Sequence, residues 1–409
     1  MKIFTISQVV ILKLLILGAG ASKAYTQSKT KEKMPIACDF FDTFNKLEIS
    51  SNQWVLISKI SLYVLEKYGV DAFSYFASGI DIEEFHSSIE CDLIEAISSK
   101  NHIESQFFQE AYNEIVYLFA SVINEIQNGP VSKPHIQLAN YLSKEDVIAT
   151  FNWDTLIERA LEEVHGWSSD FGYGFKPKSV YRNEWQTPND KRKKSISLYK
   201  LHGSTNWLTV HPALLGNGIT LGKNVNPDDV FVFESTVNPY SCHRGRYMEG
   251  YERYSYGYYP VNLDMTKSSP DGLILVRFNP PNPYIKQGES LSAGVETIPL
   301  IIPPVKEKKY DQFGNLFNRL WQKTANAIEN ADEIIFIGYS FPKTDIKSDQ
   351  LFRSAFLKRK NKPKIKILDP YPERVVEKFK FEYGFLDSEV NVYKDYFSEQ
   401  FDIEKMLSS

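Results

Sequence analysis

The chain has 409 residues, of which 43% are hydrophobic and 24% are charged. This is ordinary globular composition, and the length allows one large domain or a core domain with a substantial insertion. With 47 basic and 51 acidic residues the net charge is −4, so no general positive field directs the protein to nucleic acid or to an acidic membrane surface.

Residues 11–17 are apolar and end in Gly-Ala-Gly, which predicts a short buried strand followed by a tight turn. A signal peptide is the alternative, because Lys2 precedes the apolar run and small residues follow it. Lys13 interrupts the run, which favours the strand. No segment reaches the roughly 18 uninterrupted apolar residues that a membrane helix needs, so no membrane association is expected.

Apolar residues recur at helical spacing in residues 54–68, 82–97 and 107–126, inside a predicted helical insertion that covers residues 43–130. A helix is also expected at 155–164. Further short apolar strands are predicted at residues 146–151, 197–201, 334–337 and 365–368. Short strands separated by helices indicate an α/β fold with a doubly wound, Rossmann-like parallel sheet, formed by residues 1–409 as a single domain. Residues 205–300, rich in Pro, Gly, Asn and Tyr, are expected to form an irregular or β-rich insertion.

Ligands of such sheets bind at the carboxyl ends of the strands, so the residues after each strand are the candidates for a site. After the first strand stand Gly18, Ala19, Gly20, Ala21 and Ser22. Small residues here allow the backbone to approach a pyrophosphate closely. The usual dinucleotide fingerprint has a third glycine where this chain has Lys23, which weakens a dehydrogenase interpretation. A tight turn without a ligand is the alternative.

Asn152 and Asp154 follow the second strand, two residues apart. Their amide and carboxylate groups are suited to face a cleft, although both residue types also cap helices. His202 follows the third strand beside Gly203 and is a candidate general base near neutral pH. Most lone histidines are structural, and that alternative stays open here.

Two further strand ends carry polar residues. Gly338 and Ser340 lie in a Gly-Tyr-Ser-Phe-Pro turn after the fourth strand, and Asp369 follows the fifth. An acidic residue at a strand end is the usual partner of a ribose hydroxyl. Ordinary turn chemistry is the alternative for both.

In this order the motifs GAGAS from Gly18, ATFNWD from Ala149, KLHGS from Lys200 and IGYSF from Ile337 resemble the sirtuin family. The resemblance is closest to its divergent bacterial branch, many of whose members are NADases of antiphage defence. It implies a Rossmann-like fold with NAD as substrate. No metal is expected, because nicotinamide is already a cationic leaving group. By the same resemblance Asn152 and His202 are the catalytic residues. The candidate NAD-binding residues, chosen because they follow the strands, are Gly18, Ala19, Gly20, Ser22, Asp154, Gly338, Ser340 and Asp369.

Deacylating sirtuins also carry two cysteine pairs that hold structural zinc. This chain has Cys38, Cys91 and Cys242, far apart and without ligand spacing, so neither bound zinc nor a disulfide framework is expected and a reducing cytoplasmic setting fits best. The chain also lacks a clear match to the acyl-lysine substrate loop, which favours NAD hydrolysis. A deacylase, an ADP-ribosyl transferase and a non-catalytic NAD-binding or scaffold subunit are the alternatives.

Tyrosines and arginines crowd residues 240–259. Both residue types are favoured anchors of protein interfaces, so this segment is predicted to face a partner or a second copy of the chain. A lid over the site is the rival interpretation, and a stacking surface for nucleic acid is less favoured. The expected partners are NAD, further copies in a homo-oligomer, and a defence-system protein such as an ATPase.

Overall fold

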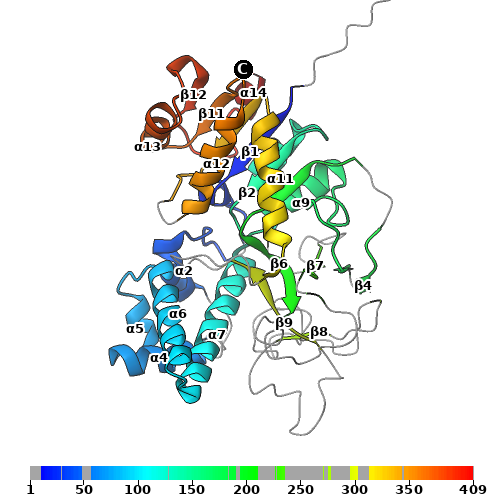
Figure 1. The fold of residues 1–409 in the computed structure, drawn as a ribbon. Helices are drawn as coiled ribbons and strands as arrows, with labels where there is room; N and C mark the ends of the chain where they lie inside the picture. The colour runs from blue at the N-terminus through cyan, green and yellow to red at the C-terminus, as the bar shows by residue number, and fades with distance from the viewer. Residues whose placement is uncertain are drawn as a thin grey trace, which may run out of the picture.

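The computed structural model describes residues 11–28, 30–47, 57–127, 129–182, 184–189, 194–210, 226, 228–234, 270, 275–277, 295–302, 313–342 and 345–408. A parallel sheet flanked by helices forms the upper part of the molecule in Figure 1, and a second, mixed sheet lies beneath it beside a group of helices. The α/β fold class predicted from the sequence is confirmed.

The upper sheet has six parallel strands in the order β12-β11-β10-β1-β2-β5. Numbered along the chain within this sheet, the order is 6-5-4-1-2-3, which is the doubly wound order of dinucleotide-binding folds. The direction of winding reverses between β1 and β10, and ligands bind at such switch points. Its strands are β1 (Lys13–Leu17), β2 (Val147–Thr150), β5 (Ser197–Lys200), β10 (Glu333–Ile337), β11 (Lys364–Leu368) and β12 (Val390–Tyr393).

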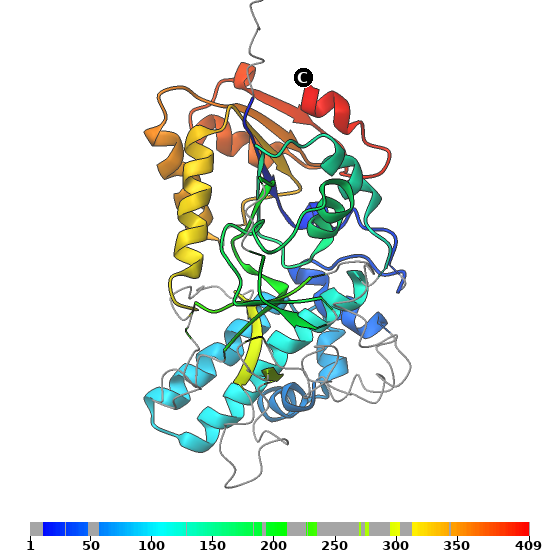
Figure 2. The same ribbon diagram turned by 90° about the vertical axis from the view of Figure 1, so that its right-hand side faces the viewer.

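Helices cover both faces of this sheet. On one face α8 (Lys133–Asn140) packs against α9 (Leu156–His165). On the other face α11 (Leu316–Asn330) packs against α12 (Ile346–Lys358), as the two views show (Figures 1 and 2). Strands buried on both sides are largely apolar, which is why β1 and β10 are continuous hydrophobic runs after their first residues.

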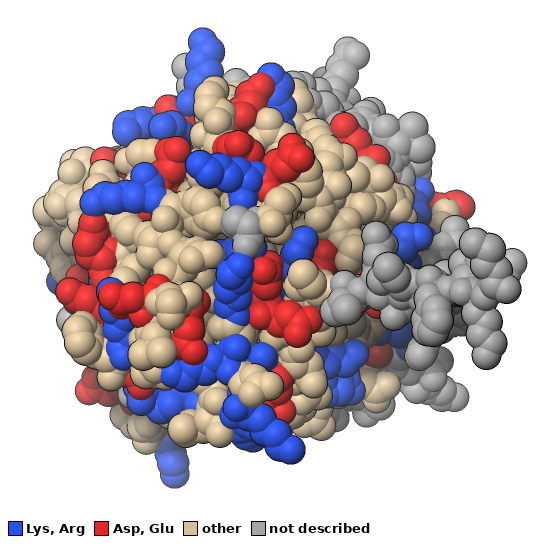
Figure 3. Space-filling model, turned by 90° about the horizontal axis from the view of Figure 1, so that it is seen from above, with Lys and Arg blue, Asp and Glu red and all other residues tan. Residues whose placement is uncertain are grey.

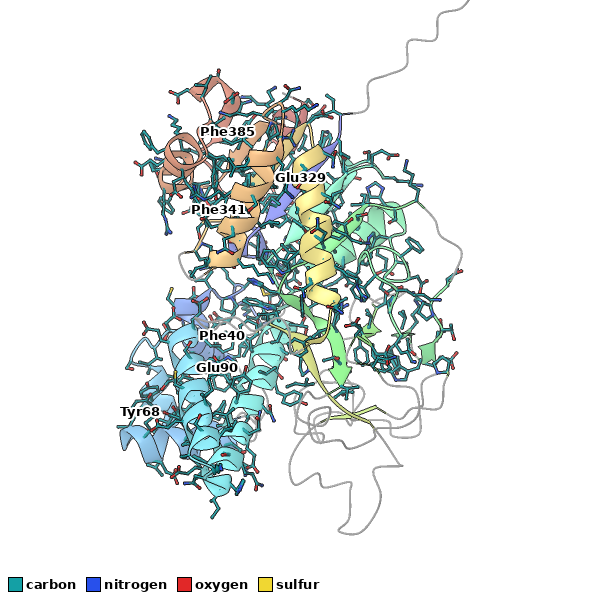
Figure 4. The ribbon with its side chains drawn as sticks, in the orientation of Figure 1. Phe40, Tyr68, Glu90, Glu329, Phe341 and Phe385 are labelled. Atoms are coloured by element: carbon teal, nitrogen blue, oxygen red, sulfur yellow. The ribbon has the colours of Figure 1, made fainter. Side chains whose placement is uncertain are left out.

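The predicted helical insertion is present. We call α2 (Phe40–Lys46), α4 (Ser58–Tyr68), α5 (Ala72–Phe76), α6 (Ile82–Ser98) and α7 (His102–Gln127) the helical module. Its core is aromatic: Phe41 stacks on Phe76 with ring centroids 4.1 Å apart, and Phe40, labelled in Figure 4, stacks on Phe119. In the part of the chain that the structure describes, no helix is long and apolar enough to cross a membrane.

The second sheet has the order β4-β3-β7-β6-β9-β8. Helix α7 packs against its strands β6 and β9, and the hydroxyl of Tyr117 on α7 donates to the carbonyl of Thr297 on β9. The described part of the predicted insertion 205–300 is therefore β-rich, whereas residues 240–259 lie outside the described residues. The strands are β3 (Ser179–Tyr181), β4 (Trp185–Gln186), β6 (Gly203–Val210), β7 (Phe231–Phe233), β8 (Leu275–Arg277) and β9 (Val295–Ile301).

Seen from above, the described surface carries basic and acidic side chains interspersed (Figure 3). On this face the described residues form no continuous basic area of the kind that tracks a nucleic-acid backbone. The mixed charge agrees with the net charge of −4.

Candidate functional site

The turns after β1 and β10 interlock at the switch point of the sheet. The Gly18 amide donates to the Ile337 carbonyl and the Gly20 amide to the Gly338 carbonyl, both at 3.0 Å. A Cβ atom on Gly18 would lie 2.4 Å from the Gly338 oxygen, and one on Gly20 would lie 2.7 Å from the Gly338 Cα. The glycines are therefore required where two backbones of the protein meet, in addition to any approach of a pyrophosphate.

The side chains of three predicted site residues form one hydrogen-bonded cluster, which also includes the carbonyl of a fourth, Gly18. The Asn152 side-chain amide donates to the Gly18 carbonyl at 2.7 Å and to the Ser22 hydroxyl at 2.8 Å. The Ser22 hydroxyl in turn donates to Asp154 Oδ2 at 2.5 Å. With both amide hydrogens engaged, Asn152 has its side-chain oxygen left to accept from a ligand.

Asp154 accepts two hydrogen bonds, one through each carboxylate oxygen. Its Oδ2 atom takes part in the cluster, while its Oδ1 atom accepts from the Leu156 amide in the first turn of α9 at 3.1 Å. The side chain is buried. One carboxylate thus accepts from an amide in the first turn of α9 and, through Ser22, is linked to Asn152.

His202 lies at the end of β5, with only 4% of its surface exposed. Its ring centroid is 5.2 Å from that of Phe151, 5.9 Å from that of Trp153 and 6.5 Å from that of Trp321. Since Phe151 and Trp153 flank Asn152, these contacts bring the second and third motifs to one place. The His202 Nε2 atom is 3.5 Å from Oδ2 of Asp345.

The fourth motif joins the same region through Tyr339. The Tyr339 ring stacks on Phe151 with centroids 4.5 Å apart and an interplanar angle of 11°, and its hydroxyl donates to Ser348 on α12. Ser340 is exposed beside it. The turn after β10 therefore packs on the turn after β2, across the end of β1.

Asp369 stands apart from this cluster. It follows β11, three strands along from β2, which at the usual spacing puts it roughly 14 Å from the Asn152 turn. Its Oδ1 atom accepts from the Tyr371 amide at 2.8 Å, and burial raises the pKa of its carboxyl. This position suits the far end of an extended ligand and does not suit the reacting centre.

Two features of the site were not predicted from the sequence. One is Asp345, which directly precedes α12 and is 3% exposed. The other is Lys200, fully buried at the end of β5, which contacts the Asp154 carbonyl and Glu158. A lysine inside an apolar strand was the available signal for the second; the sequence offered none for the first.

Within the described residues, no group of three His, Cys, Asp or Glu side chains is placed to hold a metal ion. Cys38 and Cys91 are exposed, and Cys242 lies outside the described residues. A metal-free site therefore stays a prediction.

Comparison with known proteins gives no match to a family model and no match to a curated protein. Among solved structures, a complex of a Sir2 homologue with ADP-ribose is 11% identical with a TM-score of 0.37, covering 97% of this chain and 90% of that one. A complex of a Sir2 homologue with NAD is 12% identical with a TM-score of 0.38, covering 97% and 88%. A Sir2 variant with a p53 peptide and NAD is 10% identical with a TM-score of 0.34, covering 97% and 92%. At such identities and TM-scores the similarity carries over neither a family nor an activity to this chain.

Proposed function

We propose that this protein hydrolyses NAD to nicotinamide and ADP-ribose. The observation that carries the proposal is the Ser22–Asn152–Asp154 cluster beside the switch point of a dinucleotide-type sheet. His202 follows β5, the next strand of the sheet, and its ring contacts the rings of Phe151 and Trp153. Candidate binding groups and a candidate base thus lie at the carboxyl edge of the sheet, the edge at which doubly wound sheets of this order bind dinucleotides.

NAD would lie along the carboxyl edge of the sheet. In this proposal the pyrophosphate binds against the turn after β1, which contains Gly18, Ala19, Gly20 and Ser22. The turn after β10, with Gly338 and Ser340, lines the other side of the same site. Asp369 accepts from a hydroxyl of the adenosine ribose, and the Asn152 oxygen from a hydroxyl of the nicotinamide ribose. The strand ends thus offer backbone amides, hydroxyl groups, a carboxylate and an amide oxygen as hydrogen-bonding partners for NAD.

In the reaction the bond between ribose C1′ and the nicotinamide nitrogen breaks, and nicotinamide leaves with the bonding electrons as a neutral molecule. A water oxygen forms the new bond to C1′ and its proton passes to His202. Asp154 stabilises the positive charge that develops on the ribose. The products are nicotinamide, ADP-ribose and one proton, and no metal is needed because the leaving group is already cationic.

The test is incubation of the purified protein with NAD, followed by separation of the products. Asn152→Ala and His202→Ala are each expected to lower turnover by about 100- to 10,000-fold. His86→Phe is the matched control, since His86 is equally buried but lies on α6 in the helical module. If both site variants turn over NAD like the wild type, the site is misassigned.

The same assay separates the alternative activities. A deacylase or an ADP-ribosyl transferase releases nicotinamide faster when an acyl-lysine peptide or an acceptor protein is added, whereas a hydrolase needs neither. A non-catalytic subunit binds NAD without releasing nicotinamide.

Unrestrained hydrolysis would deplete the NAD of the cell that makes the enzyme, so the proposal includes control of the activity by a partner. The motif resemblance supports a role as an effector of bacterial antiphage defence, and the dispersed cysteines support a cytoplasmic setting. We infer a homo-oligomer whose activity depends on a partner such as an ATPase. Light scattering of the isolated protein, and NAD turnover with and without the partner, test these two points.

A further inference from the structure

Lys200 is a charged side chain with no exposed surface, two residues before His202. Its ammonium group donates to the carbonyl oxygen of Asp154 and, at 2.8 Å, to Oε1 of Glu158 on α9. Burying an ammonium group is costly unless it is paired and hydrogen-bonded. Here the pairing also fastens the ammonium to the backbone of the turn that carries Asn152 and Asp154.

The carboxylate end of this ion pair is anchored in the second sheet. Glu158 Oε1 also accepts from the Tyr173 hydroxyl at 3.2 Å, and the Tyr173 oxygen accepts from the Asn206 amide at 3.1 Å. The Asn206 amide donates further to the Phe233 carbonyl at 2.7 Å. Because Tyr173 and Asn206 are buried, this chain of hydrogen bonds has little freedom to rearrange.

The Asn152 turn and the His202 turn meet at a short seam of backbone contacts. The Leu201 amide donates to the Thr150 carbonyl at 2.9 Å, and the Thr205 amide donates to the Trp153 carbonyl at 2.8 Å. Lys200 adds the contact to the next carbonyl along, that of Asp154. Its side chain therefore extends the seam to the residue whose carboxylate accepts from Ser22.

We propose that Lys200 and Glu158 are positioning residues, which hold Asp154, and through it Ser22 and Asn152, in a fixed geometry relative to His202. This inference rests on the proposed function for its effect on turnover. Neither side chain touches the reacting atoms; both act through the Asp154 carbonyl and the first turn of α9. A displacement of a catalytic group by about 1 Å is enough to cost about 100-fold in rate.

The molecule contains a matched control. Lys366 on β11 is also fully buried and lies 2.9 Å from Glu333, which has 10% of its side chain exposed. Glu333 is the first residue of β10, so this second pair is toward the amino end of the strands, away from the candidate site. Each variant therefore removes a buried lysine–glutamate pair whose lysine lies on a strand of the parallel sheet.

The experiment compares the double variants Lys200→Met/Glu158→Leu and Lys366→Met/Glu333→Leu. Replacing both partners of a buried pair by apolar residues avoids an uncompensated buried charge and often preserves stability. For the first variant we expect kcat for NAD to fall about 10- to 100-fold, more than KM changes. We also expect faster amide hydrogen exchange over residues 152–156. The control variant should keep the wild-type kcat and the wild-type exchange there.

Equal losses of kcat in the two double variants would overturn the proposal, because the effect would then belong to any buried pair. Wild-type kcat and unchanged exchange in the first variant would overturn it as well. If the wild-type protein does not cleave NAD, the proposed function fails, yet the exchange comparison still decides the positioning role. Unchanged protection of residues 152–156 would then reject it.

Discussion

The Nε2 atom of His202 lies 3.5 Å from Oδ2 of Asp345, and both side chains are almost fully buried. The contact joins the two halves of the sheet, because His202 follows β5 and Asp345 leads into α12 after β10. A carboxylate beside an imidazole orients the ring and stabilises its protonated form. Asp345 is therefore placed to assist His202, the general base of the proposed reaction.

The first prediction concerns this contact. Asp345→Asn keeps the shape of the side chain and removes its charge, so His202 loses stabilisation when it takes up the proton of the attacking water. We expect kcat/KM for NAD to fall by at least about 10-fold. Asp349→Asn, one helical turn further along α12, is the control, since Asp349 pairs with Lys378 and does not contact His202 among the interactions described. Wild-type kinetics in Asp345→Asn would show that the contact has no part in the reaction.

A second prediction compares a glycine that is required because backbone lies too close for a side chain with a glycine that is favoured because its φ is positive. A methyl group on Gly18 meets the Gly338 oxygen at 2.4 Å and the Tyr339 Cα at 2.6 Å, and backbone cannot move aside cheaply. Gly18→Ala should lower the free energy of unfolding by about 3 kcal/mol or more. Gly166→Ala is the control: its φ is +60° but nothing lies within 4 Å of the added atom, so the loss should be about 1 kcal/mol. Urea unfolding of both variants measures the difference, and equal midpoints would contradict the packing argument.

Five of the six strands of the parallel sheet could be predicted from the sequence, because each is a short, mainly apolar run that ends at glycine or a polar residue. The edge strand Val390–Tyr393 was missed, since Asn391 interrupts its short apolar run. Ser22, Asn152 and Asp154 were chosen as strand-end residues, and the parallel topology brought them together. Their mutual hydrogen bonds follow from strand order, which the motifs alone do not specify.

Asp345 and Glu158 show why the rest of the site could not be predicted. Glu158 lies on a helix whose spacing marks it as an ordinary helical glutamate; its partner, Lys200, arrives from a different strand. Asp345 reaches His202 because α12 begins opposite the end of β5. Such pairs depend on tertiary packing between segments distant in the chain, so the local sequence pattern around either partner does not predict them.

A third prediction concerns the Tyr-rich segment 240–259, which lies outside the described residues. Tyrosine offers a large contact area for little conformational entropy, and arginine adds planar hydrogen bonding. Replacing Tyr251, Tyr254 and Tyr256 by Ser should change the oligomer mass or partner binding and leave the KM for NAD nearly unchanged. A triple variant that keeps its mass and its partner but loses NAD affinity would identify the segment as a lid instead.

The last prediction is a pH dependence of stability that originates in the helical module. His86 on α6 is 1% exposed, its ring lies 4.6 Å from that of Tyr112, and burial lowers its pKa from 6.5 to about 3. The folded protein keeps this imidazole neutral, whereas the unfolded chain takes up a proton below pH 6.5. The stability that His86 allows is therefore complete above pH 6.5 and is lost as the pH falls toward 3, by about 2 kcal/mol at pH 5.

His86→Phe keeps an aromatic ring in the core and has no proton to bind. Urea unfolding at pH 7 and pH 5 should show a smaller loss of stability in this variant than in the wild type. His102→Gln, at the exposed start of α7, should behave like the wild type. If His86→Phe loses as much stability as the wild type between pH 7 and pH 5, the acid sensitivity arises elsewhere in the protein.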